Sequence, residues 1–283
     1  MTGLSKIKYL KQYKLSNVFA MMRNNRKKPE VCNDDFKGRL VIITGATSGI
    51  GYQVECDYKI ADFARLPDVR KVGKELLESD LEIDVLIHNA GLYSTKKIYT
   101  EDGNELVFQV NYLGSFILNY MLKDKLKAQG KTRIILVNSE GHRFAVFGIG
   151  LYDLKYEKRR HSGLGSYGVA KTGQLLSIIK FAEYFEDSGV TINAVHPGDV
   201  KSNMGLNNGR LYRFFKTKIV NRTLKSPERS ATALYYHGVS KEVEGISGKF
   251  FNLTTEEEPA PPALDRDVAE ELWHKTIELV GLE

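Results

Sequence analysis

Residues 39–51 read Arg39-Leu-Val-Ile-Ile-Thr-Gly-Ala-Thr-Ser-Gly-Ile-Gly51, and this stretch decides the fold of the 283-residue chain. Its first half is a short continuous apolar run, which is typical of a central strand in a parallel sheet. The glycines that follow, Gly45, Gly49 and Gly51, let the backbone turn tightly and approach an anion such as a pyrophosphate with its N–H groups. No Gly-Lys-Ser/Thr ending follows, so the loop is not that of a nucleoside triphosphatase. The stretch therefore predicts the first strand and turn of a dinucleotide-binding α/β fold.

Strands and helices are predicted to alternate along the rest of the chain. Short apolar runs that end in small or polar residues predict strands, and apolar residues at helical spacing predict helices. The predicted strands are residues 84–91, 133–139, 190–198 and 248–253, and the predicted helices are residues 66–79, 105–126, 167–188, a helix starting at Ser226, and residues 265–280. This alternation, without linker or repeat, indicates a single doubly wound parallel sheet in one Rossmann-type domain, residues 38–283.

The segment after the glycine turn is too short for the unit that should follow. Residues 54–62 already have the pattern of another strand, and only the eleven residues 45–55 separate Thr44 from Cys56. A parallel crossover needs about a dozen residues or more, usually with a helix, and a whole βαβ unit needs about 30. The second strand and its flanking helices are therefore predicted to be missing or severely shortened, with a distorted or open cofactor half as the result.

Residues 1–37 form a basic N-terminal arm. They hold nine Lys or Arg and three acidic residues, so the arm accounts for the entire net charge of +6. A neutral body argues against nucleic-acid binding. Leu4, Ile7, Leu10 and Leu15 lie among lysines in the pattern of a short basic amphipathic helix, which could rest on an anionic membrane surface. The alternatives are a solvated leader and a helix that packs on the domain.

Cysteine usage and apolar content predict an intracellular, cytoplasmic protein. Cys32 and Cys56 make no disulfide framework, and neither has neighbours at a metal-ligand spacing, so no metal is predicted. No apolar run approaches the ~18 residues of a membrane span. The apolar piece Val18-Phe-Ala-Met-Met22 is too short for the core of a signal peptide. Peripheral membrane contact through residues 1–28 and assembly into a homo-oligomer are left open.

Three residues carry the predicted chemistry: Ser139, Tyr167 and Lys171. Ser139 ends an aliphatic run, which places it at the carboxyl edge of a strand, where open α/β sheets bind ligands. Tyr167 and Lys171 are four residues apart and share one helix face. An ammonium beside a phenol is expected to lower the pKa of the tyrosine from its ordinary value of about 10, so that it can exchange a proton near neutral pH.

The Tyr-x-x-x-Lys pattern is weak by itself, because the chain contains it three times, as Tyr93–Lys97, Tyr167–Lys171 and Tyr212–Lys216. A solvated lysine one turn from a half-buried tyrosine explains an arbitrary pair. Only the middle pair opens a long apolar-periodic helix that follows a serine-terminated strand, and this context selects it.

The motifs also occur in the order of a known family. They are Thr44-Gly-Ala-Thr-Ser-Gly-Ile-Gly51, Asp62-Phe63, Asn89-Ala-Gly91, Val110-Asn-Tyr-Leu-Gly114, Ser139, Tyr167 with Lys171, and Pro197-Gly198 with Ser202. From about residue 35 to its end the chain thus resembles the short-chain dehydrogenases/reductases. Ser139-Glu-Gly-His142, the long spacing from Ser139 to Tyr167 and the ending Glu271-Leu-Trp-His-Lys-Thr-Ile-Glu-Leu-Val-Gly281 resemble the retinol-dehydrogenase-like branch. The family's commoner, shorter spacing would select Tyr152, but tyrosine instead of lysine stands four residues beyond it.

The resemblance implies an NAD(P)-dependent oxidoreductase that interconverts a lipophilic alcohol, retinoid-like or steroid-like, with its ketone or aldehyde. Tyr167 would be the general acid/base, Lys171 would lower its pKa and bind the nicotinamide ribose, Ser139 would hold the substrate oxygen, and Asn111 would support a water-linked proton relay. The implied cofactor residues are Gly45, Ser48, Gly49, Ile50 and Gly51 at the pyrophosphate, Asp62, Asn89, Ala90 and Gly91 on the adenine side, and Pro197, Gly198 and Ser202 at the nicotinamide end.

Plainer interpretations stay open beside these roles. Asn111 is also explained as a polar residue inside a helix, Asp62 as a strand-end cap and Pro197-Gly198 as a simple turn, while His88 and His142 are predicted to be structural. The residue that selects NAD or NADP lies in the shortened segment, so either cofactor is expected. The aromatic and basic residues 199–225 are of the kind that cover a site. The alternative function is a truncated, catalytically weak relative that acts as an interaction or membrane-surface protein.

Overall fold

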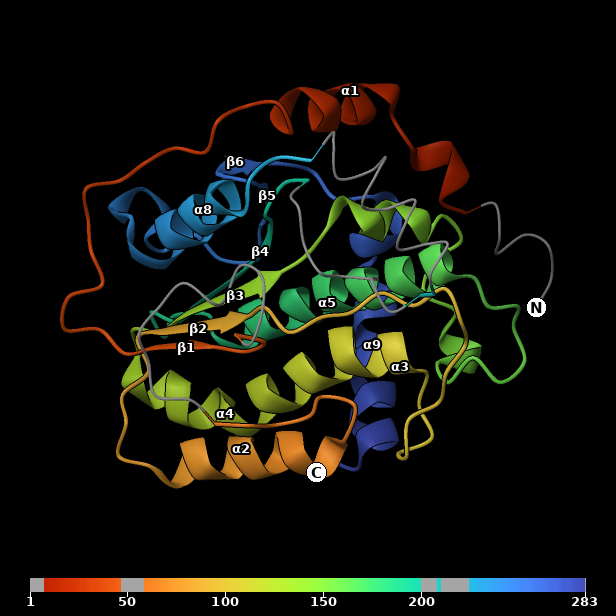
Figure 1. Ribbon diagram of the computed structural model, residues 1–283, viewed down its shortest axis with the longest axis horizontal. Coiled ribbons are helices and arrows are strands. Elements are labelled where there is room, and N and C mark those ends of the chain that lie inside the picture. Colours follow the sequence, from red (N-terminus) through yellow and green to blue (C-terminus); the bar gives the residue numbers. More distant parts are fainter. Residues whose placement is uncertain (1–7, 47–58, 200–207, 210–223, 283) are drawn as a thin grey trace.

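The computed structural model describes residues 8–46, 59–199, 208–209 and 224–282. Several predictions therefore lie outside the described residues. They are the cofactor contacts of Ser48, Gly49, Ile50, Gly51 and Ser202, the first part of the predicted strand at 54–62, and most of the predicted cover at 199–225. Figure 1 shows the arrangement of the elements.

The described residues build one sheet of six strands in the order of the sequence. The strands are β1 (Val41–Ile43), β2 (Val85–His88), β3 (Arg133–Val137), β4 (Thr191–His196), β5 (Phe250–Asn252) and β6 (Thr255–Glu256). The first five are parallel, and β6 returns antiparallel to β5. Every residue of β2, β4 and β5 is buried, as expected of parallel strands covered on both faces. The predicted Rossmann-type α/β sheet is confirmed.

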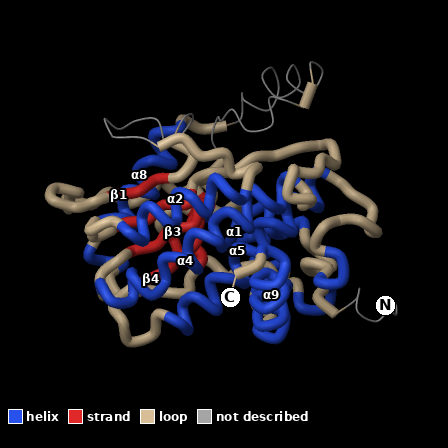
Figure 2. The backbone as a smooth tube through the Cα atoms, turned by 90° about the horizontal axis from the view of Figure 1, so that it is seen from below, coloured by secondary structure: helices blue, strands red, loops and turns tan. Residues whose placement is uncertain are grey.

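Alternate residues of the strands enter two cores on opposite faces of the sheet. The larger core joins the sheet to α2 (Leu66–Glu78), α4 (Gly114–Gln129), α5 (Gly163–Tyr184) and α9 (Arg266–Val280). The smaller core lies against α8 (Pro227–Val239) and the side chain of Phe36. Seen from below, the helices of the larger face lie in front of the strands (Figure 2). Both faces are thus covered by residues far apart in the sequence.

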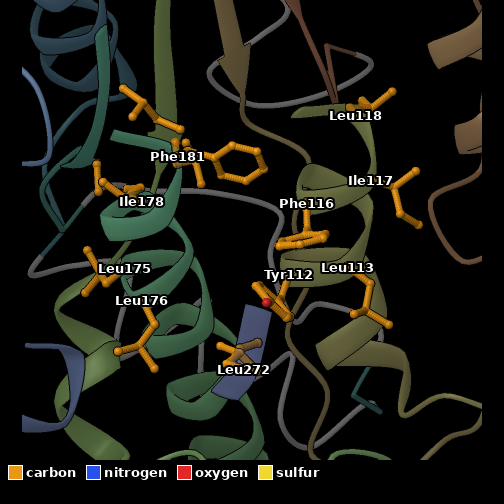
Figure 3. Close-up of a cluster of buried hydrophobic side chains, with 14 of the residues drawn as sticks. Tyr112, Leu113, Phe116, Ile117, Leu118, Leu175, Leu176, Ile178, Phe181 and Leu272 are labelled. Atoms are coloured by element: carbon orange, nitrogen blue, oxygen red, sulfur yellow. The ribbon is translucent and has the colours of Figure 1, made fainter. Parts of the chain in front are cut away.

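Aromatic side chains fill the larger core between α4, α5 and α9. Phe116 is 1% exposed, and its ring centroid lies 5.5 Å from that of Phe181 and 5.1 Å from that of Trp273. Figure 3 shows Phe116 between Tyr112 and Phe181 in this cluster. The contacts join the three helices that support the carboxyl edge of the sheet.

Replacing Phe116 with alanine is expected to lower the free energy of unfolding by about 3–5 kcal/mol, because the change removes a buried aromatic ring and leaves a cavity. Urea unfolding followed by circular dichroism measures this difference. Leu77→Ala is the matched control, since Leu77 is 43% exposed on α2. Equal destabilisation by both changes would contradict the packing described here.

In the described part of the chain the strand β1 lies at an edge of the sheet. Its composition favours a central strand, whereas the short segment after the glycine turn predicts that the neighbouring strand is missing. Among the described residues β1 pairs with β2 alone, and its three residues are only half-buried. The predicted strand at 54–62 is wrong where it is described, because residues 59–62 are irregular and Ile60 is 89% exposed. The run of apolar residues at 40–43 thus indicated a strand correctly but not its number of neighbours.

The predicted helix at 105–126 is interrupted. It begins as α3 (Leu106–Phe108), passes through a π-helical turn at Gln109–Leu113 and continues as α4. Such π turns inside α-helices occur frequently at functional sites. Asn111, one of the predicted site residues, lies in this turn and is fully buried.

The N-terminal arm packs on the domain. After a 3₁₀ turn at Leu10–Gln12, helix α1 (Leu15–Asn24) crosses the molecule above the carboxyl ends of the strands (Figure 1). Tyr9 is buried and donates its hydroxyl to Asp265 at 2.8 Å. No helix in the described ranges has the length and apolar character needed to cross a membrane.

Candidate active site

Ser139 lies just beyond the carboxyl end of β3 and begins a 3₁₀ turn at Glu140–Phe144. Its backbone N–H donates to Asn138 Oδ1 at 2.8 Å, its carbonyl lies 2.8 Å from His142 Nδ1, and its Oγ accepts from the Gly141 N–H at 3.0 Å. These three bonds fix the orientation of the serine. The sequence predicted this place at the edge of the sheet.

Tyr167 and Lys171 lie one turn apart near the start of α5. The helix begins after Ser162, whose Oγ accepts from the Gly165 N–H, and so starts earlier than predicted. The side chains of Tyr167 and Ser139 lie close together, both against Gly141. Gly141 allows this approach, since a Cβ at that position would lie 2.6 Å from Tyr167 Cε1. The structure thus brings the predicted serine and tyrosine together.

Lys171 is buried and directs its amine away from the phenol. Its Nζ donates to Val137 O at 2.7 Å and to Gln174 Oε1 at 3.1 Å, and lies 5.8 Å from the centre of the Tyr167 ring. Burial lowers the pKa of Lys171 to about 7. Burial also raises the pKa of Tyr167, with the neighbouring Ser139 hydroxyl acting in the opposite direction. The expected lowering of the tyrosine pKa is therefore wrong for this arrangement, because desolvation of the phenol dominates while the amine of Lys171 binds Val137 O and Gln174 instead.

Two residues that the sequence analysis missed hold Lys171 in place. Asn138 donates its Nδ2 to Lys171 O at 2.9 Å and to Gln174 Oε1 at 3.0 Å. Gln174 therefore accepts from both the amide of Asn138 and the amine of Lys171. The available signal was position: Asn138 directly precedes the serine, and Gln174 stands one helical turn after the lysine.

The turns after β1 and β2 are fastened to each other. Asn89 Nδ2 donates to Thr44 O and Gly45 O, both at 3.1 Å, and the backbone N–H groups of Asn89 and Ala90 donate to Thr44 Oγ1. Gly45 has φ +69°, and a Cβ there would lie 2.6 Å from Ala90 Cα. Only glycine fits this close approach. The described start of the turn therefore suits a dinucleotide, which needs backbone without side chains at this edge.

Asn111 holds the turn after β2. Its Nδ2 donates to Leu92 O at 2.8 Å and to Val107 O at 2.9 Å, and its Oδ1 accepts from the Leu92 N–H at 3.2 Å. These bonds match the plainer interpretation of Asn111 as a buried bridging residue. They also fix the position of Gly91, whose Cβ would clash with Asn111 Oδ1 at 2.7 Å.

The remaining predicted residues flank the carboxyl edge. Asp62 is exposed and caps the next turn through a 2.9 Å bond from the Ala64 N–H. Pro197 and Gly198 follow β4, where Gly198 has φ +86° and Pro197 O accepts from Ser230 Oγ at 2.7 Å. His88 and His142 have structural contacts, to Asn119 at 2.7 Å and to the Ala260 N–H at 3.0 Å respectively.

A cavity of about 590 Å³, here called the substrate cavity, lies against Ser139 and Tyr167. Its other lining residues come from several elements: Tyr13, Lys14, Asn17, Val18, Met21, Tyr93, Glu140, Gly141, Arg143, Phe144, Leu164, Asp199, Leu224 and Pro261. The sequence analysis did not predict that the N-terminal arm lines it. The signal was the helical spacing of Tyr13, Asn17 and Met21, every fourth residue along the arm.

A cluster of two carboxylates and one guanidinium adjoins Ser139. Arg143 Nε binds Glu140 Oε2 at 2.6 Å, and Arg143 Nη2 binds Glu257 Oε1 at 2.7 Å. Burial raises the pKa of Glu140 to about 7, against the attraction of Arg143. In the part of the chain that the structure describes, no group of three or more His, Cys, Asp or Glu could hold a metal ion.

The parallel sheet, the glycine turn and the adjacent Ser139 and Tyr167 are the features of an enzyme whose reaction uses a dinucleotide cofactor. Residues 53–153 match the sequence model of the short chain dehydrogenases. The chain is 32% identical to human retinol dehydrogenase 13 over 87% of this chain and 86% of that protein. It is 35% identical to human retinol dehydrogenase 14 over 83% of this chain and 69% of that protein. The chain belongs to the short-chain dehydrogenase/reductase family, in its retinol-dehydrogenase-like branch, and is an NAD(P)-dependent oxidoreductase.

Solved structures show the same fold. An uncharacterized protein from Mycobacterium paratuberculosis superposes with a TM-score of 0.65 at 21% identity, over 92% of this chain and 97% of that chain. A protein described as a short chain dehydrogenase/reductase family protein gives a TM-score of 0.56 at 18% identity, over 76% of this chain and 96% of that chain.

Proposed function

We propose that the protein interconverts a lipophilic alcohol, retinoid-like or steroid-like, with its aldehyde or ketone, and that Tyr167 is the general acid/base. The observation that carries the proposal is the close approach of Ser139 and Tyr167, both against Gly141, at the wall of the substrate cavity. Val18, Met21, Phe144, Leu164, Leu224 and Pro261 give this cavity an apolar lining. The retinol dehydrogenases among its relatives support the same substrate class.

The residues of the site share the tasks of this proposal. NAD or NADP, when bound, supplies or accepts the hydride. Ser139 holds the substrate oxygen, and the apolar walls exclude water from it. In the reducing direction Tyr167 gives its proton to that oxygen, and in the oxidising direction it takes the proton back. The raised pKa of Tyr167 keeps the phenol protonated at neutral pH, ready to donate.

Lys171 and Asn111 complete the proton path in this proposal. In the reducing direction the phenol regains its proton by way of the Lys171 amine, whose pKa is near 7, and in the oxidising direction the proton leaves by the same path, with Asn111 supporting a chain of waters behind the amine. Gln174 and Asn138 orient the lysine through their shared hydrogen bonds. Lys171 also binds the ribose of the cofactor.

The cofactor is proposed to lie along the carboxyl edge from β1 to β4. The residues assigned to it are Gly45, Ser48, Gly49, Ile50, Gly51, Asp62, Asn89, Ala90, Gly91, Tyr167, Lys171, Pro197, Gly198 and Ser202. Titration of NADH and of NADPH, followed by the change in their own fluorescence, tests the assignment. Saturable binding of either supports it. No binding of either would mean that the short segment after the glycine turn has removed the cofactor site.

The activity test is a panel of alcohols and carbonyls, including all-trans-retinol, retinal and a hydroxysteroid, assayed with each nicotinamide cofactor by absorbance. We expect turnover of at least one lipophilic substrate. Absence of turnover across the panel in both directions would reject the proposed function.

A membrane-surface role is the second candidate, and α1 favours it. Leu15, Phe19 and Met22 are 76%, 68% and 47% exposed on this helix, and Lys11, Lys14 and Arg23 lie near them. An apolar strip among basic residues suits peripheral contact of residues 1–28 with anionic lipid at the cytoplasmic side. Co-sedimentation with phosphatidylserine vesicles, compared with phosphatidylcholine vesicles, tests this contact. Vesicle binding without turnover would favour a catalytically weak surface protein, and binding with turnover a peripheral enzyme.

A further inference from the structure

Helix α1 has two distinct faces. Its inner face, with the preceding turn, places Tyr13, Asn17, Val18 and Met21 on the wall of the substrate cavity. Its outer face carries Leu15 and Phe19, which are 76% and 68% exposed. The cavity is therefore closed on this side by a segment that precedes the first strand of the sheet, and not by the domain alone.

Asn24, the last residue of α1, anchors the helix. Its side chain is 3% exposed although it lies on an arm at the surface. Its Nδ2 donates to Glu257 Oε2 at 3.0 Å, and the other oxygen of Glu257 binds Arg143. A buried amide on a terminal segment indicates a specific attachment, because terminal segments are ordered only where they are tied down.

The anchor continues to the catalytic turn. Arg143 joins Glu257 to Glu140, the residue after Ser139, and Asn252 donates to both carboxylates at 3.2 and 3.3 Å. One set of buried polar bonds thus connects the end of helix α1 to the turn that begins at Ser139.

Further bonds hold the arm on either side of the helix. Tyr9 binds Asp265 before it, and the Glu30 N–H donates to Thr254 Oγ1 at 3.0 Å after it. Arg229 of α8 donates to Asn25 O at 3.0 Å. These bonds attach both ends of α1 to the domain, with its inner face on the cavity that Tyr167 also lines.

We propose that helix α1 is a specificity-determining wall of the substrate cavity, and that Asn24 is the positioning residue that holds this wall through Glu257. The proposal rests on the proposed function, since it concerns which alcohol reaches Ser139 and Tyr167. Val18 and Met21 set the width of the cavity, so the protein selects among lipophilic substrates by their bulk.

The first test changes the wall. Met21→Ala widens the cavity and Val18→Phe narrows it, and the readout is the ratio of kcat/KM for all-trans-retinol to kcat/KM for hexanol. We expect Met21→Ala to raise this ratio and Val18→Phe to lower it, each about ten-fold or more, as for a change of a few methylenes in an apolar pocket. Phe19→Ala, on the outer face of the same helix, is the matched control and should leave the ratio unchanged.

A second readout does not depend on turnover. The fluorescence of retinol reports its dissociation constant for each variant, and we expect Val18→Phe to weaken retinol binding about ten-fold relative to Phe19→Ala. If the inner-face and outer-face variants had equal kcat/KM ratios and equal dissociation constants for retinol, the proposal that α1 is a specificity-determining wall would be wrong. Lack of turnover by the unaltered protein, with retinol binding still sensitive to Val18, would reject the proposed function and keep the wall.

The third test changes the anchor. Asn24→Leu keeps the size of the side chain but removes its donor, and we expect faster tryptic cleavage at Arg23 and Arg26 together with a loss of discrimination between the retinol and hexanol substrates. Ser16→Ala, at an exposed position of α1, is the control. Unchanged cleavage and an unchanged substrate ratio in Asn24→Leu would show that the anchor does not position the wall.

Discussion

Tyr167→Phe is expected to lower kcat/KM by about 10²–10⁴-fold in both directions, the range that general acid/base catalysis contributes. The change removes the hydroxyl of a side chain that lies beside Ser139 at the cavity wall, and leaves the ring in place. The dissociation constant for retinol should change little, because the hydroxyl contributes to the proton transfer and not to the apolar contacts. Steady-state kinetics and the retinol fluorescence titration separate these effects.

Tyr152→Phe is the matched control for this change. Tyr152 stands at the shorter serine-to-tyrosine spacing, and its side chain is 55% exposed. We expect its loss of activity to be less than two-fold. Retention of activity by Tyr167→Phe would show that another group moves the proton, and loss in Tyr152→Phe alone would contradict the assignment of the catalytic helix.

Most of the fold followed from local patterns. The apolar runs before Ser139 and Pro197 indicated β3 and β4 correctly, and Ser226 was a correct helix start because its Oγ caps the Glu228 N–H. The apolar patterns did not predict the position of a strand within the sheet, because that position depends on which other strands pair with it. The composition of β1 is that of a central strand, but its position at an edge depends on what pairs with its other side.

Ser139 and Tyr167 could be proposed from the sequence because the serine ends a strand and the tyrosine opens a helix, and the structure places the two side chains next to each other. The direction of the tyrosine pKa could not be predicted, because it depends on burial and on where Lys171 directs its amine. Glu257, more than a hundred residues after Arg143, and helix α1 before the first strand reach the site only through tertiary packing.

Acidification from pH 7 to pH 5 is expected to destabilise the protein strongly. His88, His142, His196 and His237 are buried, and burial lowers the pKa of His142 to about 3 and of the other three to about 4. Their ordinary pKa, that of the unfolded chain, is about 6.5. Since the folded-state values are lower, the stability that these groups contribute is present above pH 6.5 and is lost as the pH falls towards 4.

The size of the effect follows from the number of protons. Near pH 5 the unfolded chain binds up to four protons that the folded chain does not, and each is equivalent to about 1.4 kcal/mol per pH unit. The loss is therefore as much as about 5.5 kcal/mol per unit. Glu140 opposes it: its pKa is raised to about 7, so its contribution to stability grows as the pH falls from 7 towards 4.5. Burial raises the pKa of Glu105 as well, so Glu105 acts in the same direction as Glu140. Two carboxyl groups against four histidines leave the direction unchanged.

Urea midpoints measured from pH 7.5 to pH 5 check the slope. His88→Asn should reduce it by about one proton, because asparagine keeps a polar group opposite Asn119 but does not titrate. His274→Gln should leave it unchanged, because the side chain of His274 is 71% exposed on α9. A midpoint that stays constant over this range would mean that the four histidines are not buried in neutral form. The contacts of His142 require the neutral form, because its Nδ1 faces Ser139 O and its Nε2 accepts from the Ala260 N–H. Acid should therefore displace Ser139 as it unfolds the core.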